Sequence, residues 1–178
     1  MQYLQDTGFV IKRTNFGEAD RYITLFTKTH GKIDVVARGV RKITSRRASH
    51  IELLHLIRFQ TVQGKQNPIL TEAQLVRGFY DQSASLEQLS ARFLVCELLN
   101  KLCASYEQNE SVYHLVEKTL QSLEQGAIRD TMHTFQINLL TNLGYWDQKR
   151  TFYDEHDVRN FIEGIIEKRL KTKLYFEF

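Results

Sequence analysis

The hydrophobic pattern of residues 1–80 is typical of short β-strands. Apolar and polar residues alternate in short runs rich in β-branched and aromatic side chains, and turn residues such as Gly17, Gly31 and Pro68 separate the runs. Five runs have this character: GFVIKRTNF (8–16), RYITLFTKT (21–29), KIDVVARGV (32–40), LLHLIRFQTV (53–62) and PILTEAQLVRGF (68–79). Pro68 opens the last run, where a missing backbone N–H disturbs a sheet least. The pattern therefore predicts a small barrel of five strands.

Beyond residue 82 the apolar residues recur at spacings of three and four, which is typical of amphipathic helices. Ser85 followed by Gln88 matches a capping box and predicts the start of a first helix. Its predicted buried stripe consists of Leu86, Leu89, Phe93, Cys96, Leu99, Cys103 and Tyr106. The spacing thus predicts one long helix over this segment.

Three more helices follow from the same spacing. Residues 112–123 and 128–143 carry apolar stripes that end at Gly126 and Gly144, and glycine is the residue that most readily adopts the left-handed conformation after a helix. Asp154 is the predicted N-cap of a fourth helix. Its apolar face is predicted to contain Val158, Phe161, Ile162, Ile165, Ile166 and Leu170.

These patterns predict an α+β fold, with a five-stranded barrel followed by an all-helical domain. A barrel of this size matches the OB or the SH3-like type. We place the boundary at the change of period. This gives a small barrel domain at residues 1–81 and a helical bundle domain at residues 82–178.

Two small clusters in the helical part are predicted to be structural. Cys96 and Cys103 lie in an apolar periodic segment, so we interpret them as buried packing residues and not as a disulfide or a metal pair. An aromatic cluster is predicted to pack at the end of the bundle, with base stacking as the alternative. It consists of Tyr145, Trp146, Phe152 and Tyr153.

The two parts of the chain differ in charge. Residues 1–80 contain 13 lysines and arginines and 6 acids, a net charge of +7, whereas residues 81–178 contain 11 and 15, a net charge of −4. A basic module joined to a mildly acidic one indicates that the first contacts a polyanion. The sequence shows neither a signal peptide nor an apolar run long enough to span a membrane, so we expect a cytoplasmic protein with no membrane partner.

The densest group of charges lies in VARGVRKITSRRASH, residues 36–50, which contains no acid. Its cations are Arg38, Arg41, Lys42, Arg46 and Arg47. The segment runs from the end of the third predicted strand into a loop, and like charges at this density repel one another unless an anion is bound. We therefore predict that this loop grips nucleic-acid phosphates. The neighbouring cations expected to assist are Lys12, Arg13 and Lys32.

Two other interpretations of these charges stay open. The loop could be basic only for solubility. Alternatively, the protein is an interaction adaptor whose basic loop docks an acidic peptide of a partner. Salt dependence separates DNA binding from peptide binding, because contacts with several phosphates weaken steeply as salt rises.

Sequence patterns of common enzyme classes are missing. HGK at 30–32 lacks the upstream glycine of a Walker loop, and neither HExxH nor a nucleophile elbow occurs. Glu18 and Asp20 are predicted to stabilise a turn through hydrogen bonds and an ion pair with Arg21. His30, beside a turn glycine, is expected to be structural. We expect neither an enzyme nor a cofactor.

One ordered set of residues resembles a known family. The set comprises Gly17-Glu18-Ala19-Asp20-Arg21, Leu25, Thr27, His30-Gly31-Lys32, Ala37-Arg38-Gly39, Arg41 and Ser45. Together with the strand before it, this segment resembles the N-terminal domain of the RecO family of DNA repair and recombination proteins. The similarity continues through LTEAQLVRGF at 70–79 and to LLTNLGY at 139–145, and so covers about four fifths of the chain.

The resemblance implies that residues 1–81 are an OB-fold nucleic-acid-binding domain, followed by a helical domain at residues 82–178. It also implies a non-enzymatic mediator of DNA repair and homologous recombination. Such a protein is expected to bind single- and double-stranded DNA without sequence specificity and to anneal complementary strands. The expected partners are a RecR-type mediator and the acidic C-terminal tail of the single-strand DNA-binding protein. Together they help to load a RecA-type recombinase, and the resemblance implies the bacterial cytosol as the place of action.

The chain departs from the family pattern after Gly144, where many relatives insert a four-cysteine zinc module. The segment GYWDQKRTFYDEHDVRN, residues 144–160, contains no cysteine. His133 and His156 lack partners at zinc-ligand spacing. We therefore expect no metal site.

Overall fold

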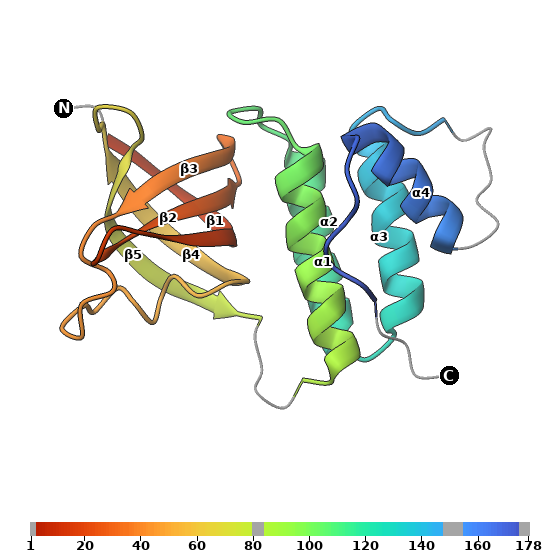
Figure 1. The fold of residues 1–178 in the computed structure, drawn as a ribbon, viewed down its shortest axis with the longest axis horizontal. Helices are drawn as coiled ribbons and strands as arrows, with labels where there is room; N and C mark the ends of the chain where they lie inside the picture. Colours follow the sequence, from red (N-terminus) through yellow and green to blue (C-terminus); the bar gives the residue numbers. More distant parts are fainter. Residues whose placement is uncertain (1–2, 80–83, 148–154, 175–178) are drawn as a thin grey trace. The chain divides into compact units, whose positions relative to one another are not determined.

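The computed structural model describes residues 3–79, 84–147 and 155–174. The chain divides into two compact units, one with Met1–Gln82 and Ala104–Glu110 and the other with Ser83–Cys103 and Ser111–Phe178. The first unit contains a closed β-barrel and the second contains helices (Figure 1). This confirms the predicted α+β fold.

The barrel is built from the five predicted strands. They are β1 (Tyr3–Phe16), β2 (Asp20–Thr27), β3 (Gly31–Ala37), β4 (His55–Val62) and β5 (Ile69–Gly78). Their order around the ring is β1-β2-β3-β5-β4, which agrees with an OB-type barrel. Neighbours pair antiparallel except β3 and β5, which run parallel and meet in the single registered pair Val36 and Ile69. The ladder between β3 and β5 is therefore short.

β1 begins five residues earlier than its hydrophobic pattern predicts and serves both sides of the ring. Tyr3–Phe9 pair with β4, and Gly8–Phe16 pair with β2. A register shift between Val10 and Lys12 marks a bulge, which bends a strand and increases its twist. The first part of β1 contains polar residues, so hydrophobic alternation alone missed it.

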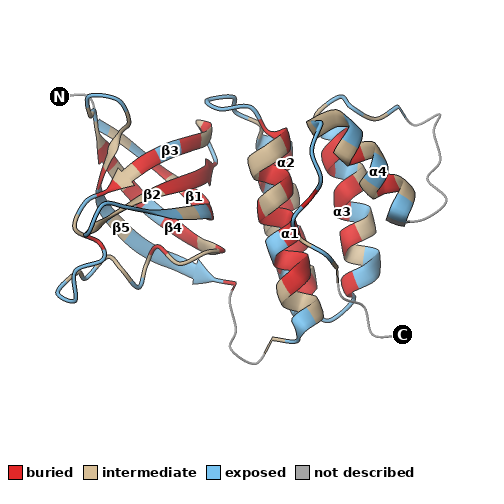
Figure 2. Ribbon diagram, viewed as in Figure 1, coloured by how far each residue is buried: buried red, intermediate tan, exposed pale blue. Residues whose placement is uncertain are grey.

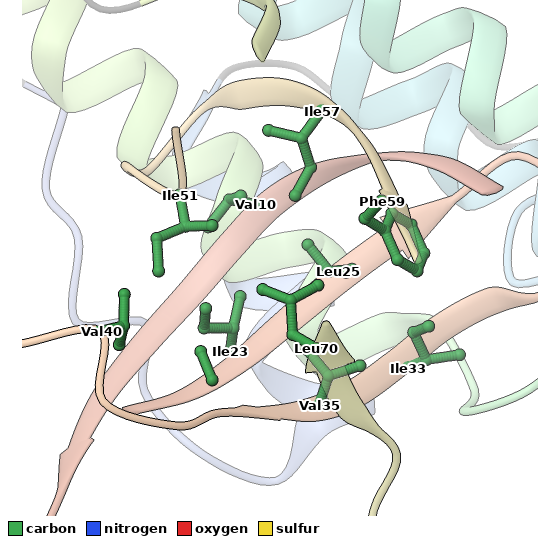
Figure 3. Close-up of a cluster of buried hydrophobic side chains, with 11 residues drawn as sticks. Val10, Ile23, Leu25, Ile33, Val35, Val40, Ile51, Ile57, Phe59 and Leu70 are labelled. Atoms are coloured by element: carbon green, nitrogen blue, oxygen red, sulfur yellow. The ribbon is translucent and has the colours of Figure 1, made fainter. Parts of the chain in front are cut away.

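The barrel core is formed by inward-facing aliphatic and aromatic residues from all five strands (Figure 3). Two further core residues, Val40 and Ile51, come from the long connection between β3 and β4 and are almost fully buried. Leu54, also buried, donates its backbone N–H to Val10 O and has a positive φ of 66°. The connection is therefore anchored in the core although its other residues are mostly exposed or intermediate.

Four helices follow, as predicted. They are α1 (Leu86–Leu102), α2 (Glu110–Glu124), α3 (Ile128–Asn142) and α4 (Glu155–Ile166). The predicted capping box is present, since Gln88 N–H donates to Ser85 Oγ and Ser85 N–H donates to Gln88 Oε1. Gly144 has a φ of 75° after α3, as the left-handed position requires. Asp154, the predicted cap of α4, lies outside the described residues.

The predicted buried stripe of α1 is wrong in part. Leu86 and Phe93 are exposed, and the helix ends at Leu102, so Tyr106 lies beyond it. The buried residues are Ser90, Ala91, Arg92, Leu94, Val95, Cys96, Leu98, Leu99 and Leu102. Because this sequence is apolar on more than one side of the helix, several stripes fit the same spacing, and only packing selects among them (Figure 2).

A segment after α4 is held by charged side chains of two helices, and we call residues 167–174 the C-terminal segment. Glu97 of α1 accepts the backbone N–H groups of Lys171 at 2.9 Å and Thr172 at 2.8 Å. Arg159 of α4 donates to Leu170 O and Thr172 O. Burial acts to raise the pKa of the Glu97 carboxyl, but these hydrogen bonds outweigh it and hold the pKa below its ordinary value.

Residues Ala104–Glu110, between α1 and α2, belong to the barrel's unit and contact the turn between β2 and β3. Tyr106 N–H donates to Lys32 O at 2.9 Å, and Gln108 Nε2 donates to Lys28 O. Gly31 has a φ of 65°, and a Cβ atom there would clash with the backbone carbonyl oxygen of Glu107. Glycine is thus required at this turn for both its conformation and the close contact.

Candidate nucleic-acid interface

Residues 38–54, which we call the basic loop, connect β3 to β4 and are tied to the turn between β1 and β2. Gly39 N–H donates to Asp20 Oδ1 at 2.7 Å. Arg41 contributes two bonds, from its backbone N–H to Ala19 O at 2.9 Å and from Nη1 to Gly17 O at 2.8 Å. Val40, which lies between Gly39 and Arg41 in the sequence, is buried in the barrel core. The first part of the loop therefore has a defined position on the barrel.

Arg47 ties the second part of the loop to both strands at the short β3–β5 ladder. Its Nη2 donates to Arg38 O at 2.8 Å, directly after β3, and its Nη1 donates to Leu70 O at 2.6 Å and Thr71 O at 3.3 Å in β5. The guanidinium therefore bridges two strands that share one registered pair. It has correspondingly fewer N–H groups left for a phosphate.

The other four cations of the loop are exposed: Arg38, Arg41, Lys42 and Arg46. Figure 2 shows the loop mostly in the colours of exposed and intermediate residues. Arg41 and Lys42 help to line an open pocket of about 410 Å³, whose other lining residues are Arg21, Val40, Ile43, Ala48, Ser49 and Glu52. Ile43 in this pocket is fully exposed. The structure thus places four exposed cationic side chains on one anchored loop.

The three assisting cations lie in different places. Arg13 forms an ion pair with Glu52 of the basic loop, with Nη1 and Oε1 2.5 Å apart. Lys12, one residue before it on β1, is exposed. Lys32 lies near the start of β3, whereas the basic loop follows the end of that strand. The structure brings Arg13 to the basic loop and places Lys32 at the other end of β3.

Arg21 is a cation of this site that the sequence pattern did not single out for DNA binding. It lines the pocket, and its Nη1 lies 3.9 Å from Glu52 Oε1 while its Nε donates to Asn15 Oδ1. The predicted local ion pair with Glu18 or Asp20 is therefore replaced by a contact with Glu52. The position of Arg21 directly after the β1–β2 turn was the only sequence signal for its place in this site. Its partner Glu52 lies 31 residues away in the sequence.

Comparison with known protein families tests the resemblance noted in the sequence. Residues 1–79 match the family model described as "Recombination protein O N terminal", and residues 83–146 match "Recombination protein O C terminal". The chain belongs to the RecO family. It is similar to proteins named "DNA repair protein RecO" from Roseiflexus sp. strain RS-1, with 34% identity over 79% of this chain and 50% of the relative, and from Acetivibrio thermocellus, with 32% identity over 82% and 59%. A third, from Dehalococcoides mccartyi strain BAV1, is 32% identical over 80% of this chain and 57% of its own length.

The chain spans about half to three fifths of the length of these RecO relatives. Several residues that carry the RecO resemblance hold the turns around the basic loop. Asp20 accepts from Gly39 N–H and Arg41 donates to Gly17 O, whereas Thr27 Oγ1 donates to Gly31 O in the β2–β3 turn, at the other end of β3. In this RecO chain Asp20, Gly39 and Arg41 of the motif therefore fix the basic loop on the barrel, and Thr27 and Gly31 hold the β2–β3 turn.

A second polar network at the β2–β3 turn is also structural. Asp6 Oδ2 accepts from Thr29 N–H and Oγ1 and lies 2.9 Å from His30 Nδ1. Burial acts to raise the pKa of the Asp6 carboxyl, but the hydrogen bonds from Thr29, His30 and Thr7 hold it below its ordinary value. This agrees with a structural role for His30.

Both cysteines of this RecO chain are buried, and the potential metal ligands of its described residues are dispersed. No group of three His, Cys, Asp or Glu side chains in residues 3–79, 84–147 and 155–174 could hold a metal ion. Cys96 and Cys103 are buried and unbonded to each other, as predicted, although Cys103 is the C-cap of α1 and not part of its stripe. Burial raises the pKa of the Cys96 thiol to about 12, so it stays protonated.

Of the predicted aromatic cluster, the structure describes two members. Trp146 packs edge-to-face on Phe161 of α4, with ring centroids 5.5 Å apart, which favours the packing interpretation for that residue. Tyr145 is partly exposed, and Phe152 and Tyr153 lie outside the described residues. Among the described helices, none is long and apolar enough to cross a membrane.

Proposed function

We propose that this RecO-family protein is a non-enzymatic mediator that binds single- and double-stranded DNA through its basic loop and anneals complementary strands. The observation that carries the proposal is the set of exposed cations Arg38, Arg41, Lys42 and Arg46 on a loop anchored at both ends. An anchored loop loses little conformational freedom when it binds. Arg47 acts in this proposal by holding the loop in position.

Binding is independent of base sequence in this proposal. Lysine and arginine side chains on a loop contact phosphates, whose spacing is the same in every sequence, and phosphate contacts position a protein without reading bases. Annealing follows from the same chemistry, because cations that neutralise phosphates lower the repulsion between two strands. Glu52 also lies in the basic loop, but its negative charge is paired with Arg13 and does not neutralise the four exposed cations.

The partners are proposed from the family relationship and the charge pattern. A RecR-type mediator, the acidic tail of the single-strand DNA-binding protein and, indirectly, a RecA-type recombinase are the expected partners in the bacterial cytosol. The net charge of +7 on residues 1–80 favours DNA as the ligand of the barrel.

A salt titration of oligonucleotide binding tests the proposal. Each phosphate that a cation neutralises contributes about 0.7 to the slope of log affinity against log salt for a single strand. We expect the double variant Lys42→Gln with Arg46→Gln to reduce the slope by about twice that amount, and Lys65→Gln, an exposed cation in the β4–β5 connection, to change nothing. Equal slopes in all three proteins, or a shallow slope in the unaltered protein, would refute DNA binding by this loop and favour an acidic peptide.

A further inference from the structure

An aromatic pair lies beside the basic loop on the outside of the barrel. Phe16 is the last residue of β1 and Tyr22 lies in β2, and their ring centroids are 4.6 Å apart with an angle of 55° between the ring planes. Phe16 is 49% exposed although it is a large apolar side chain. A pair of rings in contact with each other and open to solvent is a surface on which a further flat ring can pack.

The register of the strands shows that both rings point away from the core. Tyr22 is directly opposite Thr14, which lies two residues before Phe16 on the same face of β1. Ile23, the next residue of β2, is fully buried in the barrel core, so Tyr22 faces outward. The pair is therefore part of the outer surface of the sheet and not of its interior.

One cation lies on the strand of Phe16, and another is hydrogen-bonded to the turn that follows this strand. Lys12 is exposed on the same face of β1, and Arg41 donates to the carbonyl of Gly17, the residue after Phe16. Of the acids in the turn and on β3, Asp20 accepts from Gly39 N–H, Asp34 accepts from Thr24 Oγ1, and Glu18 is exposed. Arg41 thus ties the basic loop to the turn that directly follows Phe16.

We propose that Phe16 and Tyr22 form a stacking platform for an unpaired nucleobase whose phosphates are held by the basic loop. The proposal rests on the DNA binding proposed above and assigns a separate role to the rings. Aromatic stacking requires a base that has left its pairing partner, whereas phosphate contacts do not. The platform would therefore make this surface favour single strands and hold bases apart from one another before they pair.

The test compares two single-stranded oligomers of equal length, oligothymidine and an abasic strand with the same number of phosphates. The unaltered protein should bind oligothymidine about tenfold more tightly than the abasic strand, in the range found for one stacked base. Phe16→Leu and Tyr22→Leu should each lose most of this preference and keep the affinity for the abasic strand. Phe16→Trp should retain the preference because it retains a ring.

The matched control is Tyr3→Leu, since Tyr3 is an aromatic residue, 60% exposed, at the opposite end of the same strand. It should leave both affinities unchanged. If Phe16→Leu weakened the binding of both oligomers equally, or of neither, the platform would be refuted while DNA binding by the loop would stand. If the unaltered protein bound neither oligomer, the proposed DNA binding itself would be wrong.

Discussion

Replacement of Arg47 by glutamine should destabilise the barrel, whereas replacement of its neighbour Arg46 should not. The two residues are adjacent and chemically identical, but Arg47 joins the end of β3 to β5 through three backbone carbonyls, and Arg46 is exposed. Glutamine shortens the side chain and removes the guanidinium. The strands β3 and β5 would then be held mainly by their one registered pair and by the core.

The magnitude follows from the three distances. The bonds to Leu70 O and Arg38 O are 2.6 and 2.8 Å long, and the third, to Thr71 O, is weak at 3.3 Å. Two good hydrogen bonds from a charged donor contribute about 3–6 kcal/mol when they are buried. The Arg47 side chain is only partly buried, and water can hydrate the freed carbonyls, so we expect Arg47→Gln to lower the free energy of unfolding by about 2 kcal/mol.

Urea unfolding followed by circular dichroism measures this change. Arg46→Gln should shift the free energy of unfolding by less than about 0.5 kcal/mol, as is usual for exposed positions. The loss of unfolding free energy in Arg47→Lys should lie between the losses in Arg46→Gln and Arg47→Gln, because one ammonium group cannot bridge both strands as a planar guanidinium does.

The same two variants should have the opposite order of effects on DNA binding, where Arg46→Gln should change more than Arg47→Gln. Arg46→Gln should lower the salt slope of single-strand binding by about 0.7, and Arg47→Gln should leave it unchanged under conditions in which the protein is folded. If Arg47→Gln kept full stability and reduced the salt slope, the role of this side chain in closing the barrel would be refuted. Equal destabilisation by both variants would refute it as well.

Three further predictions concern stability and reactivity. Gly31→Ala should destabilise the protein much more than Gly17→Ala in thermal unfolding. Both positions have a positive φ, but only at Gly31 would a Cβ atom meet another part of the backbone, the carbonyl oxygen of Glu107. Equal destabilisation by the two variants would contradict this close approach. Because the pKa of Glu97 is lowered in the folded state, its contribution to stability should be complete above the ordinary carboxyl pKa of about 4.3 and be lost as the pH falls through the lowered value. Glu97→Gln should reduce this acid-dependent destabilisation in urea titrations between neutral and acidic pH, and an unchanged pH profile would argue against the hydrogen bonds to the C-terminal segment. Cys96, with its pKa raised to about 12, should resist alkylation by iodoacetamide at pH 8 until the protein unfolds, and rapid labelling of the folded protein would disprove its burial.

The order and type of the elements could be predicted from the amino-acid pattern alone. Alternation predicted five strands because the inward positions of a small barrel are mostly apolar, and the spacing of three and four predicted four helices. Local signals also predicted helix limits, since the capping box at Ser85 and the glycine after α3 depend on residues within a few positions. The density of cations in residues 36–50 was equally visible, because charge is a property of residue type.

Long-range packing determines which side of α1 is buried and which cations of the loop are engaged. Arg46 and Arg47 are indistinguishable in the sequence, and the partners of Arg47 are backbone carbonyls up to 24 residues away. Backbone groups carry no residue-type signature, so no pattern of letters predicts such a bond. The same reason applies to Gly31, whose neighbour Glu107 lies in the connection between two helices and is brought to the turn only when the chain folds.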